Sequence, residues 1–225
     1  MPTAISELTT MRVGGPAREF AVAKTSDELV SLVRAADAAH TSVLLIGGGS
    51  NLVVADSGFD GLVIKVETSG TRIDGDSMWV AAGEPWDPVV AASLDEGLAG
   101  LEALSGIPGL TGATPVQNVG AYGTVTSDVL RELTVYDRES GRIEVWGPDR
   151  CGFGLHRQSV FKHSMRYVIL DTTMALRRST VSDPVRYAGL ADRLGVTIGD
   201  TVPAKDVREA VLDLRGQKGM VLDPA

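Results

Sequence analysis

Residues 43–51 have the sequence Val-Leu-Leu-Ile-Gly-Gly-Gly-Ser-Asn. The four apolar residues predict a buried strand, and the three glycines predict a tight turn directly after it. Consecutive backbone N–H groups in such a turn can point into one concavity that suits phosphate oxygens, and Ser50 and Asn51 add side-chain donors. The stretch is neither a Walker A loop, which needs Lys-Ser/Thr, nor a Rossmann turn, which a helix pattern would have to follow. A glycine-rich β-turn without a ligand explains it equally well.

Further strands and helices are expected on both sides of this stretch. Runs rich in Val, Leu and Ile predict strands over residues 18–24, 42–46, 52–55, 61–66, 77–82, 129–137, 142–146 and 166–176. Helical spacing of apolar residues predicts a helix capped by Ser26 and further helices over 86–96, 184–194 and 203–215. Residues 98–124 show no period, and a loop of that length inside a compact domain is usually functional. The mixture predicts an α+β fold.

The composition excludes several classes of protein. Among 225 residues, 44% are hydrophobic and 22% are charged, as in folded globular chains rather than disordered ones. The single cysteine, Cys151, excludes a disulfide framework, and no apolar run approaches the ~18–20 residues of a membrane-spanning helix. The first residues lack the pattern of a secretory signal, and the net charge of −8 argues against nucleic-acid or anionic-membrane partners. We therefore expect a cytoplasmic protein.

Three other segments could carry chemistry. Residues 105–123, SGIPGLTGATPVQNVGAYG, hold small residues and amides against which a flat heteroaromatic ring could lie, although a structural Ω-type loop is the alternative. Residues 151–162 include Arg157, which out of context is an ordinary surface arginine. His156 and His163 have no third ligand at a convincing spacing, so no metal site is expected. Residues 215–218 fit an anion site or a solvated helix end equally well.

Taken together and in this order, these segments resemble the MurB family of flavoenzymes, the UDP-N-acetylenolpyruvoylglucosamine reductases. The matching stretches are LTTMRVGGPA (8–17), LLIGGGSNLVV (44–54), GLEALSGIPGLTGATPVQNVGAYG (100–123), SVFK (159–162), VRYAGL (185–190) and LRGQKG (214–219). The resemblance covers essentially the whole chain, and residues 100–123 are its most specific part.

The resemblance implies a fold and a reaction. The fold is an FAD-binding domain of the vanillyl-alcohol-oxidase (PCMH) type over residues 1–178, with α+β subdomains over about 1–66 and 67–178, followed by the beginning of a substrate-binding domain over 179–225. The reaction is reduction of UDP-N-acetylenolpyruvoylglucosamine to UDP-N-acetylmuramate in peptidoglycan precursor synthesis. NADPH is the hydride donor, and the hydride passes through N5 of a non-covalent FAD. A monomer is expected.

The same resemblance implies roles for individual residues. Arg157 matches the catalytic arginine, whose cation polarises the substrate carboxylate. Tyr187 and Lys218 match positions that contact the nucleotide diphosphate of the substrate. The implied cofactor-binding residues are Gly47, Gly48, Gly49, Ser50, Asn51, Leu52, Ala113, Thr114, Gln117, Asn118, Gly120 and Arg215.

Two departures from the family pattern bear on activity. Just before the SVFK stretch, the family has Phe-Gly-Tyr-Arg. Residues 153–157 of this sequence are Phe-Gly-Leu-His-Arg, which is one residue longer and lacks the tyrosine. Alignment from SVFK places Arg157 at the catalytic position, and alignment from Phe-Gly places His156 there; we favour Arg157 because a guanidinium is permanently charged and can grip a carboxylate with two donors. The sequence also stops before the family's Gly-Ser-Phe-Phe motif and catalytic glutamate, so we expect flavin binding with little or no turnover.

Two alternatives remain at this point. One is a non-catalytic FAD-binding module of the same family. The other is a flavin oxidase of the same superfamily, many of which attach the flavin covalently through a histidine near the phosphate loop. The nearest histidine to residues 47–51 is His40, which argues against covalent attachment.

Overall fold

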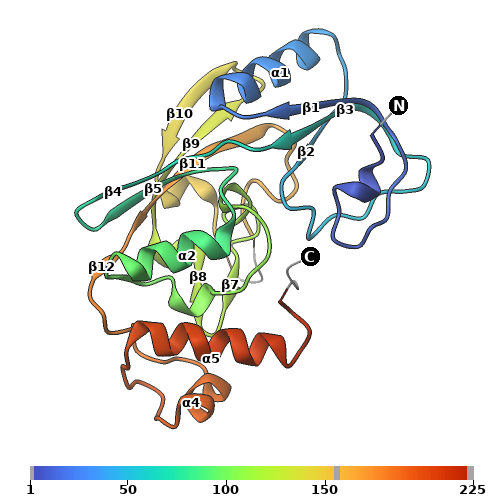
Figure 1. The fold of residues 1–225 in the computed structure, drawn as a ribbon. Helices are drawn as coiled ribbons and strands as arrows, with labels where there is room; N and C mark the ends of the chain where they lie inside the picture. Colours follow the sequence, from blue (N-terminus) through green and yellow to red (C-terminus); the bar gives the residue numbers. More distant parts are fainter. Residues whose placement is uncertain (1–2, 155–157, 222–225) are drawn as a thin grey trace.

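The computed structural model describes residues 3–154 and 158–221 (Figure 1). Its N-terminal part is a three-stranded parallel sheet with strand order β1 (Ala17–Ala23), β3 (Phe59–Val66) and β2 (Val43–Ile46). Helix α1 (Ser26–Ala38) connects β1 to β2 and buries Leu29, Val30, Val33 and Ala36 in a cluster with strand residues. The helix cap is Thr25 rather than the predicted Ser26, because the Thr25 side chain accepts a 3.1 Å hydrogen bond from the Glu28 N–H.

A second, five-stranded antiparallel sheet follows. Its strand order is β10 (Arg142–Trp146), β9 (Leu130–Asp137), β11 (Tyr167–Ala175), β5 (Ser77–Ala81) and β4 (Thr71–Asp74). The long strand β11 is central, and α1 shares a buried cluster with Tyr136, Val168 and Leu170 of this sheet. The first sheet therefore packs on the second through α1.

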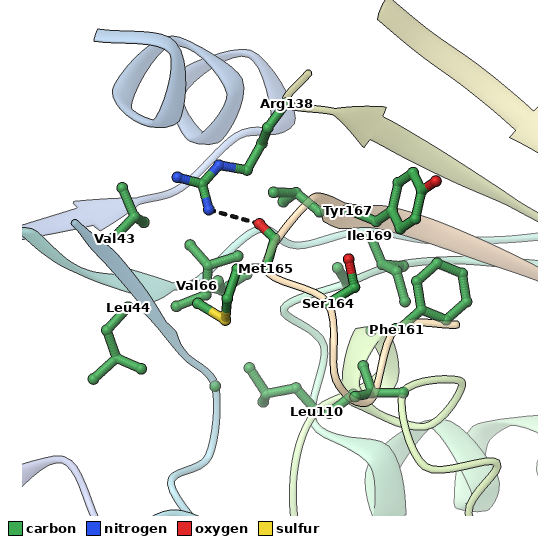
Figure 2. A pocket seen from close by; sticks show the side chains of 17 residues that line it. Val43, Leu44, Val66, Leu110, Arg138, Phe161, Ser164, Met165, Tyr167 and Ile169 are labelled. Carbon is green, nitrogen blue, oxygen red and sulfur yellow. Dashed lines mark hydrogen bonds between the residues drawn. The ribbon is translucent and has the colours of Figure 1, made fainter. Parts of the chain in front are cut away.

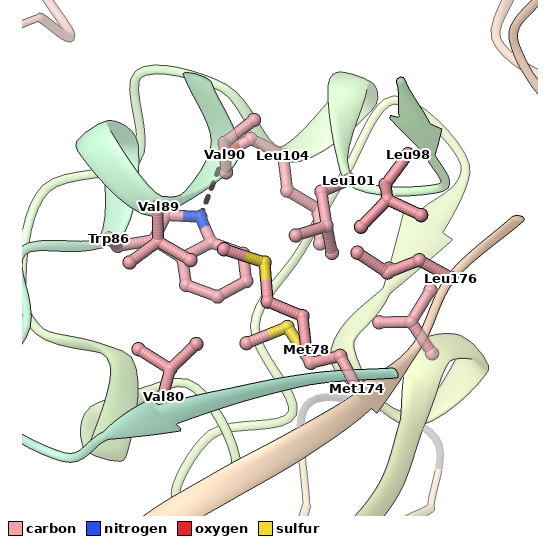
Figure 3. Close-up of a cluster of buried hydrophobic side chains, with 11 residues drawn as sticks. Met78, Val80, Trp86, Val89, Val90, Leu98, Leu101, Leu104, Met174 and Leu176 are labelled. Atoms are coloured by element: carbon pink, nitrogen blue, oxygen red, sulfur yellow. Dashed lines mark hydrogen bonds between the residues drawn. The ribbon is translucent and has the colours of Figure 1, made fainter. Parts of the chain in front are cut away.

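The largest buried cluster lies between the second sheet and helix α2 (Trp86–Asp95), as Figure 3 shows. Met78 and Met174 on adjacent strands face Trp86, which is 1% exposed. The indole N–H of Trp86 donates a 2.9 Å hydrogen bond to the Leu104 carbonyl, so the buried donor is satisfied. This bond ties the start of α2 to the irregular segment that follows it.

Two further helices, α4 (Ala188–Leu194) and α5 (Ala204–Gly216), pack on each other through a cluster of their own. They lie at the end of the molecule opposite α1 (Figure 1). The remaining elements are short: η1 (Ile5–Glu7), β6 (Leu98–Ala99), η2 (Glu102–Leu104), η3 (Thr111–Ala113), β7 (Gly120–Ala121), β8 (Thr124–Val125), α3 (Thr126–Val129), η4 (Pro148–Cys151) and β12 (Arg177–Arg178).

The α+β class is confirmed, and two predicted elements are wrong. Residues 52–55 form no strand: the Ala55 carbonyl accepts from the Gly58 N–H in a turn and from the distant Gly15 N–H, and Val53 is 70% exposed. The helix predicted from residue 184 begins at Ala188, because the preceding backbone is extended and Val185 exchanges hydrogen bonds with Gly199 and Asp200. None of the helices in the described part of the chain is long and apolar enough to cross a membrane.

Candidate functional site

A cleft of about 470 Å³ lies where the two glycine-rich segments face each other. One wall is formed by residues 45–52, at the end of β2, and the other by residues 107–120. Arg215 and Met220, from the end of α5 and just beyond it, complete the lining. The two segments that the sequence singled out separately are therefore brought together in one place.

Gly48 and Gly49 are required by how closely other backbone approaches them, whereas Gly47 faces the Leu110 side chain. Gly49 has a φ of +62°, and a Cβ atom there would overlap the carbonyl oxygen of Leu8. A Cβ on Gly48 would lie 3.0 Å from the Cα of Gly109, which belongs to the opposite wall. The glycine run thus lets three segments of backbone meet without side chains between them.

The turn after β2 also leaves backbone donors unused. The N–H groups of Gly48, Gly49, Ser50 and Asn51 donate no hydrogen bond to any residue in the described part of the chain. Gly49 is buried and Ser50 is half-buried, whereas Gly48 and Asn51 are exposed. Four N–H groups in succession at the wall of a cleft suit an anion or ordered water, and the two that are shielded from bulk solvent need such a partner most. The Ser50 hydroxyl is oriented by the Pro108 carbonyl of the other wall, at 3.4 Å.

The opposite wall is held in position by its own contacts. The Gly109 carbonyl accepts a 3.0 Å hydrogen bond from the Trp86 N–H at the start of α2. Thr114 is 3% exposed, and its hydroxyl donates to the Thr111 carbonyl at 2.8 Å. The Gln117 side chain lines the cleft and bonds to no other described residue, so its amide is available to a ligand.

Arg215 places a buried cation at the cleft. The residue is 6% exposed, and its guanidinium donates to the carbonyls of Gly106 at 3.0 Å and Met220 at 2.9 Å. Burial lowers the pKa of the guanidinium, and the nearby Tyr122 and Asp87 act in the opposite direction. An arginine stays protonated despite such a shift, so the cleft has a fixed positive charge that favours an anionic ligand or an electron-rich ring edge.

A second pocket, of about 260 Å³, adjoins the cleft and lies between β2 and β11. Its lining is mainly apolar, with Val43, Val66 and Ile169 among the side chains that face it (Figure 2). Leu110 stands at the end shared with the cleft, and Arg138 stands at the far end, as Figure 2 shows. The cleft and the pocket are neighbours, because both are lined by Leu45, Gly47, Leu110, Ala113 and Val116.

Most of the residues implied as cofactor contacts line the cleft, namely Gly47, Gly48, Gly49, Ser50, Asn51, Leu52, Ala113, Thr114, Gln117, Gly120 and Arg215. Asn118 does not. Its side chain is turned inward, donating to the Ser127 hydroxyl at 3.0 Å and accepting from the Ser127 N–H at 2.9 Å. Asn118 therefore holds α3 against the wall, and its backbone φ of +41° shapes the turn from behind.

The residues implied as catalytic or substrate contacts lie elsewhere. Arg157 is outside the described residues. Tyr187 is 46% exposed at the start of α4, and its ring meets Tyr122 edge to face at 5.4 Å between centroids. Lys218 is exposed just after α5, and no ion pair joins it to another described residue. Neither Tyr187 nor Lys218 lines the cleft.

The apolar pocket was missed by the sequence reasoning. Its lining comes from β2, β3, the 110–116 loop and residues 161–169, and each of these segments looks like ordinary core. No spacing in the sequence distinguishes a side chain that lines a cavity from one that fills it. Only the divergence of the two sheets, which separates β2 from β11, opens the space.

Comparison of the sequence with known proteins gives three similarities. The profile of a family described as "FAD binding domain" matches residues 17–147. The chain is 54% identical over 221 residues to a UDP-N-acetylenolpyruvoylglucosamine reductase of Nocardia farcinica, covering 98% of this chain and 57% of that protein. It is 52% identical over 226 residues to the reductase of the same name from Thermobifida fusca, covering 98% of this chain and 63% of that protein.

The structural similarities agree with these. The crystal structure of the MurB reductase from Thermus caldophilus superposes with a TM-score of 0.70 at 25% identity, over 100% of this chain and 70% of that one. An alkyldihydroxyacetonephosphate synthase shares the fold at a TM-score of 0.50 and 12% identity, over 70% of this chain and 31% of that one. The predicted fold of the vanillyl-alcohol-oxidase type is confirmed. The chain spans about three fifths of the length of the curated relatives it matches.

Proposed function

This chain belongs to the FAD binding domain family and resembles the MurB reductases along nearly its whole length, and from this premise we propose that its cleft holds FAD for a UDP-N-acetylenolpyruvoylglucosamine reductase. One observation carries the proposal. The four N–H groups of residues 48–51 donate to no residue in the described part of the chain, line the cleft and suit the oxygens of a pyrophosphate. A family match to FAD-binding domains and a donor-rich turn within the matched residues support the same ligand.

The residues present fit the rest of the cofactor. The apolar pocket beside the cleft, between Val43 and Ile169, suits the adenosine end. The other arm of the cleft, with the Gln117 amide and the Arg215 guanidinium, suits the polar edge of the flavin ring. A cation at that edge would stabilise negative charge on a bound ring, and the backbone of residues 107–120 would shield the ring from water.

When bound, FAD would supply hydride transfer from NADPH to the enolpyruvyl double bond. The chain's own residues would then act on substrate: Arg157 on the carboxylate, with Tyr187 and Lys218 on the diphosphate. These three roles, the NADPH preference and a monomeric state rest on the resemblance. A non-catalytic FAD-binding module is the second candidate, and the exposed positions of Tyr187 and Lys218 outside the cleft favour it.

Titration of the purified protein with FAD tests the cofactor. We expect quenching of flavin fluorescence with one FAD per chain, competition by ADP, and release of the flavin on acid precipitation. Flavin that stays with the acid pellet would indicate the covalent oxidase alternative, and no binding at all would refute the proposal.

A matched pair of variants tests the assignment of the pocket. Val66→Phe adds a ring to the apolar pocket, and we expect it to weaken both FAD binding and ADP competition. Val22→Phe makes the same change on the neighbouring strand β1, where the residue is 36% exposed, and should leave both unchanged. An NADPH oxidation assay then separates the two candidate functions. Oxidation that requires UDP-N-acetylenolpyruvoylglucosamine indicates the reductase, and FAD binding without such oxidation indicates the binding module.

A further inference from the structure

The wall of the cleft at residues 107–110 is held from behind by a cluster centred on Gly106, which has a φ of +68°. The Gly106 N–H donates a 2.6 Å hydrogen bond to Oδ1 of Asp87, and its carbonyl accepts the 3.0 Å bond from Nε of Arg215. Both backbone polar groups of this one residue are therefore bonded to charged side chains from two different helices.

Asp87 is in turn held by Arg208. The two terminal guanidinium nitrogens of Arg208 donate to the two carboxylate oxygens of Asp87 at 2.6 and 2.8 Å. This bidentate pair is the main reason that the pKa of Asp87 lies below its ordinary value. Two parallel charge-assisted bonds fix the plane of a carboxylate as well as its position, so Arg208 determines where Asp87 presents Oδ1 to Gly106.

The charged residues are arranged along two elements. Asp87 lies in the first turn of α2, and Arg208 and Arg215 lie seven residues apart on α5, which places them on the same face of that helix. A Cβ on Gly106 would lie 2.8 Å from a methyl carbon of Leu212 and 3.2 Å from the Arg215 side chain. Helix α5 thus packs directly on the Gly106 backbone, with no room for a side chain between them.

We propose that Arg208 is a positioning residue for the cofactor cleft: through Asp87 it holds Gly106, and thereby sets both the 107–110 wall and the Arg215 cation. Arg208 itself does not line the cleft. Within residues 107–110, the Gly109 carbonyl is bonded to the Trp86 N–H at the start of α2. A shift of Gly106 would therefore tilt this wall of the cleft about Gly109. The inference rests on the proposed binding of FAD.

The chain offers a matched control for this proposal. Lys205 and Asp95 form a second ion pair between the same two helices, at 2.6 Å, with side chains 63% and 69% exposed. The Arg208 and Asp87 side chains are 18% and 34% exposed. Breaking the Lys205 pair removes a salt bridge between α5 and α2 without touching Gly106. An effect common to both variants would reflect helix docking alone.

The experiment measures FAD affinity, apo-protein melting temperature and hydrogen exchange of residues 106–110 for the wild type, Arg208→Gln and Lys205→Gln. We expect Arg208→Gln to weaken FAD binding about tenfold, equivalent to about 1.4 kcal/mol, and to speed exchange of the Gly106 amide. We expect Lys205→Gln to bind FAD within about twofold of the wild type, because its pair is exposed. Arg208→Lys, which keeps the charge but loses the bidentate geometry, should lie between the wild type and Arg208→Gln.

Three results would overturn the proposal. Arg208→Gln that melts lower but binds FAD as the wild type does would show a purely structural role. Should Arg208→Gln fail to fold, Arg208→Lys with wild-type FAD affinity and wild-type exchange at Gly106 would have the same meaning. A wild-type protein that binds no FAD would refute the proposed function, and the inference with it, before any variant is compared.

Discussion

Replacing Gly49 by alanine tests why glycine is needed at this position. The reason is either the close approach of the Leu8 backbone or the left-handed turn conformation alone. Two costs act on this variant. An L-residue in the left-handed region costs about 1–2 kcal/mol, and Gly49 has a φ of +62°. The added Cβ would also overlap the Leu8 carbonyl oxygen, which belongs to backbone and has no rotamer to change; forced overpacking of this kind costs about 1–3 kcal/mol. The expected total is about 2–5 kcal/mol from these two terms.

Gly75→Ala separates the two costs. Gly75 lies in the turn between β4 and β5 with a φ of +60°, and no atom of the described residues lies within 4 Å of the place that an alanine Cβ would occupy. It should lose only the conformational part, about 1–2 kcal/mol. Urea unfolding of both variants, followed by far-ultraviolet circular dichroism, measures the difference, and FAD titration of the folded fraction follows. Equal losses of stability in the two variants would refute the contact between the glycine turn and residues 8–9.

Three further outcomes follow from single sites. Arg166 holds the pKa of Asp137 well below its ordinary range. The stability from this pair is therefore present above the unfolded carboxyl pKa of about 3.9, and it is lost as the pH falls towards the lower folded pKa. In Asp137→Asn, the urea midpoint should fall less steeply than in the wild type below about pH 4. Trp86→Phe removes the hydrogen bond to Leu104 and should cost about 1–3 kcal/mol in urea unfolding, because the carbonyl is left unpaired. The Thr172 hydroxyl is buried without a partner among the described residues, so Thr172→Val should raise the melting temperature, and a lower one would indicate a bond to ordered water.

Local patterns predicted most of the regular elements. Runs rich in β-branched residues located the long strands of the second sheet to within one or two residues, because each is flanked by turn residues. The prediction fails where a strand-like sequence has no neighbouring strand to pair with. Residues 52–55 look like a strand, but they pair with no strand of the described chain, and the Ala55 carbonyl accepts from a turn residue, Gly58, and from the loop residue Gly15 instead.

The glycine turn at 47–51 and the segment at 105–123 could be singled out as candidate ligand sites from composition, since small residues in succession expose backbone donors. That they face each other does not follow from composition, because Ser50 and its partner Pro108 are 58 positions apart in the sequence; only the family resemblance implied it. The role of Asn118 was likewise undetermined: an amide suits a ligand and a structural bond equally, and only the folded position of Ser127 decides between them.

By itself, then, the sequence determined the class of fold, the donor-rich character of residues 47–51 and the family. These depend on local backbone chemistry and on motif order. Tertiary structure alone decided the apolar pocket between β2 and β11, the burial of the Arg215 charge and the link from Arg208 through Asp87 to Gly106. Each of these depends on how two sheets diverge or how α5 docks on α2, and such packing leaves no periodic trace along the chain.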